Sequence, residues 1–153
     1  MNAFSVGIDV LLSRHQGWLS GKRIGFVSHS AAVDSEGCSS AERLFKAVGS
    51  KLTCLFGPEH GFLGAAQAGI TCDSARHPHL PVPVFSLYGK TRKPSAEMLK
   101  RVDTLVFDMQ DIGARPYTYV ATLRNVLEAA AEGGRRVIVA DRPLPLPDVV
   151  GGP

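Results

Sequence analysis

Residues 104–140 read TLVFDMQDIGARPYTYVATLRNVLEAAAEGGRRVIVA and contain a complete strand–helix–strand unit. The apolar runs at 104–107 and 136–140 predict two buried strands. The segment between them predicts a helix from Thr118, which can serve as its N-cap, to Glu132, after which two glycines end it. Helical spacing predicts an inward face made of Val120, Leu123, Leu127 and Ala130. Two strands joined through a helix run parallel in one sheet, so this unit indicates an α/β fold.

The rest of the chain repeats this alternation of strands and helices. Apolar runs predict further strands at 23–27, 51–56 and 82–87. Helices are predicted at 6–19, at 39–48 behind a capping box of Ser39 and Glu42, and at 95–101 behind the N-cap Ser95. Because most strands are apolar along their whole length, we expect a parallel sheet covered by helices on both faces, in three layers. The 153 residues have the size of a single domain, 1–153.

Composition and charge argue against several classes of protein. The net charge is only +3 and the lysines and arginines form no basic run, so we expect no nucleic-acid partner. No stretch approaches the length of a membrane span. The first residues do not resemble a signal peptide, which predicts a cytoplasmic protein, or a periplasmic or secreted one if the true N-terminus has been removed. Cys38, Cys54 and Cys72 form no C-x-x-C pair, and free thiols fit a reducing compartment.

Two motifs carry chemistry that core packing does not require: FGPEHGF at 56–62 and DMQDIGARPYTY at 108–119. Each follows a predicted strand and combines carboxylates with imidazole, guanidinium or phenol groups on turns rich in glycine and proline. Polar residues follow the predicted strands in the order Ser28, His29, Glu59, His60, Asp108, Asp111, Asp141 and Arg142. Ligands of parallel sheets bind beyond the carboxyl ends of the strands, so we expect these residues to converge on one site.

Metal and nucleotide sites receive little support. The histidines at 29, 60, 77 and 79 invite a metal interpretation, but the spacing at 77–79 matches no zinc pattern, so we predict no metal. No Gly-x-Gly-x-x-Gly motif follows the first predicted strand, which argues against a nicotinamide enzyme, and we predict no cofactor.

These motifs resemble the DUF1343 family, whose characterised members are exo-β-N-acetylmuramidases of the NamZ type. The resemblance covers nearly the whole chain and also includes the segments GKRIG at 21–25, SLYG at 86–89 and DRP at 141–143. It implies a Rossmann-like N-terminal domain that is followed by a second domain, with the site in the cleft between them. We therefore expect this chain to be the Rossmann-like half, 1–153, with the family's C-terminal domain absent.

The resemblance implies a glycoside hydrolase that releases terminal N-acetylmuramic acid from peptidoglycan fragments, as in cell-wall recycling. It implies Glu59 as the catalytic acid, and it places Asp108, Asp111, Arg115, Tyr117 and Tyr119 in the site. Glycoside hydrolysis normally needs a second carboxyl group, which Asp108 or Asp111 would supply, although an N-acetyl sugar can also use its own acetamide as nucleophile.

The substrate contacts follow from the chemistry of the sugar. Arg115 would bind the lactyl carboxylate of muramic acid, and Tyr117 and Tyr119 would stack on the sugar or hydrogen-bond to it. We also count His29, His60, Asp141 and Arg142 as substrate-binding candidates.

Each candidate also has a structural interpretation. Glu59 can order its loop or cap a helix, Asp108 can bind loop amides, and Asp111 can be a turn residue. Arg115 can form a structural salt bridge, and Asp141 and Arg142 can form an ion pair. Tyr117 and Tyr119 can simply be half-buried aromatics.

The sequence departs from the family pattern in ways that favour a second function. Leu63, Pro116 and Leu144 replace residues usual in the family, and 28–32 reads SHSAA instead of a loop with Asn and Thr-Gly. The alternative is therefore a non-catalytic sugar-binding or remnant domain that lacks the second half of the cleft. We expect a homo-oligomer, or a separate chain that supplies the missing domain, to cover an apolar patch made of Phe62, Leu63, Leu144 and Leu146.

Overall fold

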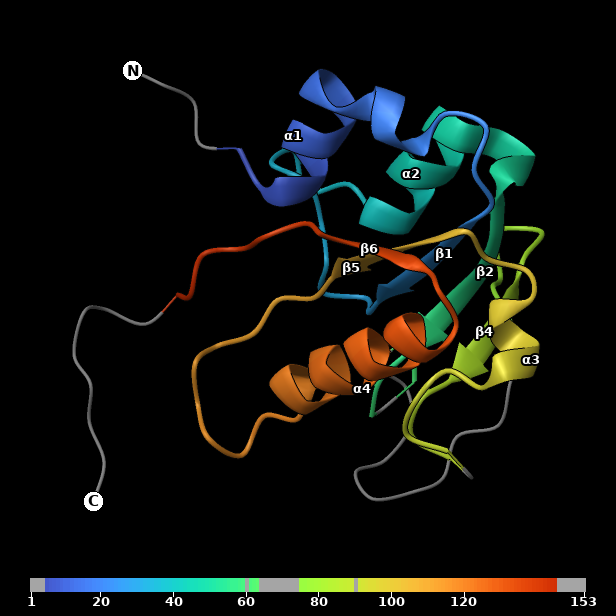
Figure 1. Cartoon of the computed structure of the whole chain (residues 1–153). Helices are drawn as coiled ribbons and strands as arrows, with labels where there is room; N and C mark the ends of the chain where they lie inside the picture. The colour runs from blue at the N-terminus through green and yellow to red at the C-terminus, as the bar shows by residue number, and fades with distance from the viewer. Residues whose placement is uncertain (1–4, 60, 64–74, 90, 146–153) are drawn as a thin grey trace.

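The computed structural model describes residues 5–59, 61–63, 75–89 and 91–145. Its centre is one sheet with strand order β3-β4-β2-β1-β5-β6 (Figure 1). The strands are β1 Ile24–Ser28, β2 Leu52–Gly57, β3 Ala75–Arg76, β4 Pro83–Ser86, β5 Thr104–Asp108 and β6 Arg136–Val139. All pairs are parallel except β3 with β4. The five predicted strands and the parallel α/β fold are confirmed, whereas the two-residue strand β3 was not predicted.

Helices cover both faces of the sheet, and each face has its own core. The helices α1 Gly7–Arg14 and α2 Ser40–Val48 lie on one face, and α3 Ala96–Leu99 and α4 Tyr119–Glu132 lie on the other (Figure 1). Short 3-10 turns follow α1 and α2, at Gln16–Leu19 and Gly49–Lys51. Successive strand residues point to opposite faces, so Phe26 packs in the α1/α2 core while Val27 packs in the α3/α4 core. This double burial explains why the central strands β1, β2 and β5 are mostly apolar.

Two of the three predicted N-caps, Ser39 and Ser95, are confirmed, and the third, Thr118, is wrong. Ser39 Oγ accepts a hydrogen bond from the Glu42 amide at 3.5 Å, and Ser95 Oγ accepts one from Met98 at 3.3 Å. Thr118 does not cap α4 with its side chain. Its hydroxyl donates to Glu59 Oε2 at 3.5 Å instead, so a contact between two loops replaces the local cap.

The buried face of α4 also differs from the predicted one. Val120 and Leu127 are 70% and 46% exposed. The buried side chains of α4 are Thr122, Val126, Ala129 and Ala130. Ala130 belongs to both sets and Leu123 is partly buried against the α3/α4 core, so the predicted face is confirmed at these two positions and wrong at Val120 and Leu127.

The predicted apolar patch is only partly exposed. Phe62 is buried in the α1/α2 core, so its place in the patch was wrong. Leu63 and Leu144 are exposed, and Leu146 lies outside the described residues. Within the described part of the chain, no helix has both the length and the apolar character needed to cross a membrane.

Candidate functional site

The strand order reverses between β1 and β5. These central neighbours are in register with Ser28 opposite Asp108, and the helices that follow them, α2 and α4, cover opposite faces of the sheet (Figure 1). In doubly wound folds ligands bind at this point, where the strand order reverses. The segments 28–30 and 108–119 both leave the sheet here.

A buried ion pair lies at this edge of the sheet, where β5 ends. The Asp108 carboxylate is fully buried, and the Arg142 side chain is only 4% exposed. Arg142 donates from Nε to Asp108 Oδ1 at 2.5 Å and from Nη2 to Oδ2 at 3.1 Å. Nη2 also lies 2.7 Å from the Val33 carbonyl and 3.0 Å from Ser40 Oγ. Arg142 thus joins the end of β5, the loop before α2 and the tail after β6.

This pairing bears on three predicted site residues. Asp108 and Arg142 face each other and are closed to solvent, which favours a structural role for both. The side chain of Asp141 is exposed, and its carbonyl accepts a hydrogen bond from the Gly7 amide at 2.8 Å. Arg142 therefore pairs with Asp108, 34 residues away, and not with its neighbour Asp141.

His29 is held as a neutral imidazole beside Tyr119. Its Nε2 accepts the Gln110 amide hydrogen at 3.0 Å, so the ring proton is on Nδ1, which lies 3.4 Å from the Tyr119 hydroxyl. Burial lowers the pKa of His29, and the Arg142 charge lowers it further against the opposing effect of Asp108. Nδ1 can then donate to the phenol oxygen, which leaves the Tyr119 O–H free to donate elsewhere.

Glu59 meets the second motif in a small pocket. The pocket of about 170 Å³ is lined by Glu59 and by the run Pro116, Tyr117, Thr118 and Tyr119. The rings of Tyr117 and Tyr119 are nearly perpendicular, with centroids 5.5 Å apart. Burial is the largest cause that raises the pKa of Tyr119, followed by its neighbours Tyr117, Asp111 and Glu59. The phenol therefore keeps its proton at neutral pH.

Asp111 combines a turn contact with a buried oxygen. Its Oδ1 accepts the Gly113 amide hydrogen at 2.7 Å, which is the predicted turn role, and Gly113 has a φ of 77°. Oδ2 is buried and has no hydrogen-bond partner within the described ranges. Arg115 is exposed on the same loop. His60, the remaining predicted residue, lies outside the described residues.

Comparison with known proteins places the chain in a family. Residues 24–153 match the family model described as "Exo-beta-N-acetylmuramidase NamZ, N-terminal". The chain belongs to this family. It is 50% identical over 139 residues to the peptidoglycan beta-N-acetylmuramidase NamZ of Bacillus subtilis (strain 168), covering 91% of this chain and 34% of that protein.

Two crystal structures of DUF1343 family proteins from Bacteroides fragilis share the fold of this NamZ family member. One has a TM-score of 0.82 at 43% identity, and the other has 0.73 at 28% identity. Each alignment covers 92% of this chain and 35% of the solved chain. The predicted family and its α/β fold are confirmed, and the chain spans about a third of the length of these relatives.

Two residues of this family member contribute to the site without having been predicted to do so. Gln110 donates from its side chain to the carbonyls of Asp111 and Pro143, both at 2.9 Å, and so joins the site loop to the tail after β6. Thr118 contacts Glu59. Gln110 lies inside the motif at 108–119, and Thr118 has the sequence of a helix cap. The sequence marks neither contact, so only the tertiary structure reveals them.

Asp34 and His77, two possible metal ligands, are engaged in other interactions. Asp34, Glu36 and Cys38 form a cluster, but Asp34 already accepts the amide hydrogens of Glu36 and Cys38, and Arg43 lies 2.7 Å from its Oδ2. His77 Nδ1 accepts the amide hydrogens of His79 and Leu80 in a local turn.

We expect Gly57→Ala to destabilise the turn that carries Glu59. A Cβ at Gly57 would lie 2.5 Å from the Phe62 amide nitrogen, so the backbone of the turn would have to move. The expected loss in the free energy of unfolding is about 1–3 kcal/mol, measured by urea denaturation. Gly17→Ala is the matched control, since a Cβ there meets nothing within 4 Å. Equal stability of the two variants would contradict the close approach of Gly57 to the Phe62 backbone.

We expect His29 to make stability depend on pH. Its native pKa is lowered mainly by burial, while the unfolded chain titrates near the ordinary value of about 6.5. As pH falls below that value the unfolded state binds more protons, so the free energy of unfolding falls. His29→Gln removes this titration and should make the profile less steep between pH 7 and pH 5, where His77, whose pKa burial also lowers, still contributes. Parallel urea-denaturation profiles for the two proteins would show that His29 is not responsible.

Proposed function

We propose that this chain forms the N-terminal, substrate-recognising part of an exo-β-N-acetylmuramidase, with Glu59 as the catalytic acid. The observation that carries the proposal is the meeting of the two motifs, where Glu59 and Tyr117–Tyr119 line one pocket and Thr118 bonds the carboxylate. The Bacillus subtilis relative is named a peptidoglycan beta-N-acetylmuramidase, which supports a muramic acid substrate.

Glu59 would donate a proton to the oxygen of the leaving sugar. For the second carboxyl group the geometry favours Asp111 over Asp108. Arg142 encloses the Asp108 carboxylate, whereas Oδ2 of Asp111 has no partner in the described part of the chain. Asp111 would act as nucleophile or base, or would polarise the acetamide of the substrate. The pair of Asp108 and Arg142 would keep the loop in place.

The exposed groups of the loop suit the two ends of a muramic acid sugar. Tyr117 is 42% exposed, and its ring can stack on the pyranose face. Arg115 is exposed on the same loop and can bind the lactyl carboxylate through two parallel hydrogen bonds. Tyr119, oriented by His29, can donate its hydroxyl hydrogen to the sugar.

The pocket is too small to hold a disaccharide alone. Its volume of about 170 Å³ lies below the roughly 300–1,000 Å³ of typical ligand pockets. We propose that a further domain, a separate chain or a second copy completes the cleft. The small pocket and the enclosed Asp108 also favour the alternative function, a sugar-binding domain without catalysis.

An NMR titration tests the recognition of muramic acid. We expect N-acetylmuramic acid to shift the amide signals of 108–119 and to bind more tightly than N-acetylglucosamine, which lacks the lactyl carboxylate. Arg115→Gln should weaken binding of N-acetylmuramic acid by about tenfold and leave N-acetylglucosamine unaffected. Arg124→Gln, on the exposed face of α4, is the control. Equal affinity for the two sugars in the wild type would count against the proposal.

A further inference from the structure

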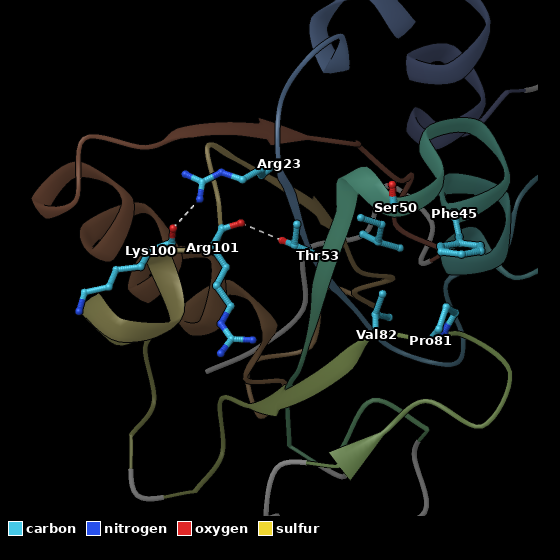
Figure 2. A pocket seen from close by; sticks show the side chains of 9 residues that line it. Arg23, Phe45, Ser50, Thr53, Pro81, Val82, Lys100 and Arg101 are labelled. Carbon is cyan, nitrogen blue, oxygen red and sulfur yellow. Dashed lines mark hydrogen bonds between the residues drawn. The ribbon is translucent and has the colours of Figure 1, made fainter.

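A second, larger cavity lies at the opposite edge of the sheet. Its volume is about 530 Å³, within the range of small-molecule sites. It lies at the amino-terminal ends of β1 and β2, beside α3 and the end of α2 (Figure 2). None of the residues predicted for the muramidase site lines it.

The cavity has one apolar wall and one cationic wall. Phe45, Pro81 and Val82 gather on one side, while Arg23, Lys100 and Arg101 lie on the other, with Thr53 between them (Figure 2). Such a division fits a ligand that has an apolar body and a negatively charged end.

Two of the three cations are already engaged. Arg23 binds Asp103 through Nη2 at 2.7 Å and Nε at 3.1 Å, and Nη1 donates to the Lys100 carbonyl at 2.7 Å. Asp103 therefore raises the pKa of Arg23, whose guanidinium is held in place. Lys100 forms an ion pair with Glu97 at 2.6 Å.

Arg101 is the cation left for a ligand. No ion pair holds its side chain within the ranges that the structure describes. Its backbone is anchored, because Thr53 Oγ1 donates to the Arg101 carbonyl at 2.9 Å (Figure 2). The exposed guanidinium extends from this anchored backbone and can offer two parallel donors to an anion.

Further cations lie along this edge, where Asp103 and Glu97 pair with Arg23 and Lys100. Cations lie just before or at the start of four parallel strands, at Lys22, Arg23, Lys51, Lys100, Arg101, Arg135 and Arg136. The carboxylates of the predicted muramidase site lie at the other edge. Clefts lined by one sign of charge raise the local concentration of ligands of the opposite sign.

We propose that this cavity binds a small amphipathic carboxylate, with its carboxylate on Arg101 and its apolar body against Phe45, Leu52 and Val82. The apolar wall favours a small molecule with an apolar body over a polyanion, which would leave that wall without a partner. The site is independent of the proposed muramidase function.

An NMR titration with 4-phenylbutyrate, and with the neutral 4-phenylbutanol for comparison, tests the proposal. We expect the acid to shift the amide signals of Ser50, Thr53, Val82 and Arg101, and to bind about tenfold more tightly than the alcohol. Arg101→Gln should remove this preference, and Arg14→Gln, an exposed arginine of α1, should keep it.

A second variant tests whether an effect of Arg101→Gln on binding arises in the cavity itself. Ser50 is exposed and lines the cavity, so Ser50→Glu adds a repelling carboxylate without disturbing the core. It should weaken binding of the acid and leave the alcohol unchanged. Equal binding of acid and alcohol by the wild type, shifts confined to other parts of the chain, or full binding of the acid by Arg101→Gln would overturn the proposal.

Discussion

Arg142→Met is expected to lower the free energy of unfolding by about 3–5 kcal/mol, because it leaves the buried Asp108 carboxylate without its partner. The loss is large compared with the roughly 5–15 kcal/mol that stabilises a typical domain. The variant also removes the donors to the Val33 carbonyl and Ser40 Oγ, so three segments lose their common anchor. Urea denaturation at pH 7 measures the effect.

Two comparisons identify the buried charge as the cause. Arg124→Met removes the partner of Glu128 in an exposed ion pair and should cost less than about 1 kcal/mol. The double variant Asp108→Leu with Arg142→Met removes both buried charges, and it should regain a large part of the stability lost in Arg142→Met. If Arg142→Met were no less stable than Arg124→Met, the pair of Asp108 and Arg142 would not stabilise the carboxyl edge of the sheet.

The fold was largely predictable because its signals are local. Strands buried on both faces are mostly apolar, as at 105–107, and the caps Ser39 and Ser95 bond to amides three residues ahead. Parallel strands then place the residues that follow them at one edge of the sheet. The prediction that Glu59 and the second motif share a site needs only this rule, and their common pocket agrees with it.

The unpredicted features depend on contacts between distant residues. Nothing near Arg142 in the sequence marks Asp108, 34 residues earlier, as its partner. Thr118 has the sequence of a helix cap, yet it bonds Glu59, 59 residues away. The buried face of α4 was predicted correctly only at Leu123 and Ala130, because two overlapping stripes fit the helical period and only packing selects between them.

Glu59→Gln is expected to have the largest effect on activity. Glutamine keeps the shape of the side chain and can still accept the hydrogen bond from Thr118, but it has no proton to give to a leaving sugar. Loss of a general acid lowers a rate by about 10²–10⁴-fold. Glu128→Gln is the matched control, because Glu128 is an exposed glutamate of α4 outside the pocket.

The decisive measurement is the release of chromophore from a chromogenic β-N-acetylmuramide by the purified wild-type chain, by Glu59→Gln and by Glu128→Gln. We predict release by the wild type and by Glu128→Gln at equal rates, and a loss of about 10²–10⁴-fold in Glu59→Gln. Equal rates in the wild type and Glu59→Gln would contradict the role of Glu59. No release by a wild-type chain that binds N-acetylmuramic acid would contradict catalysis by this chain alone, and would favour the sugar-binding alternative or a cleft that another domain or chain completes.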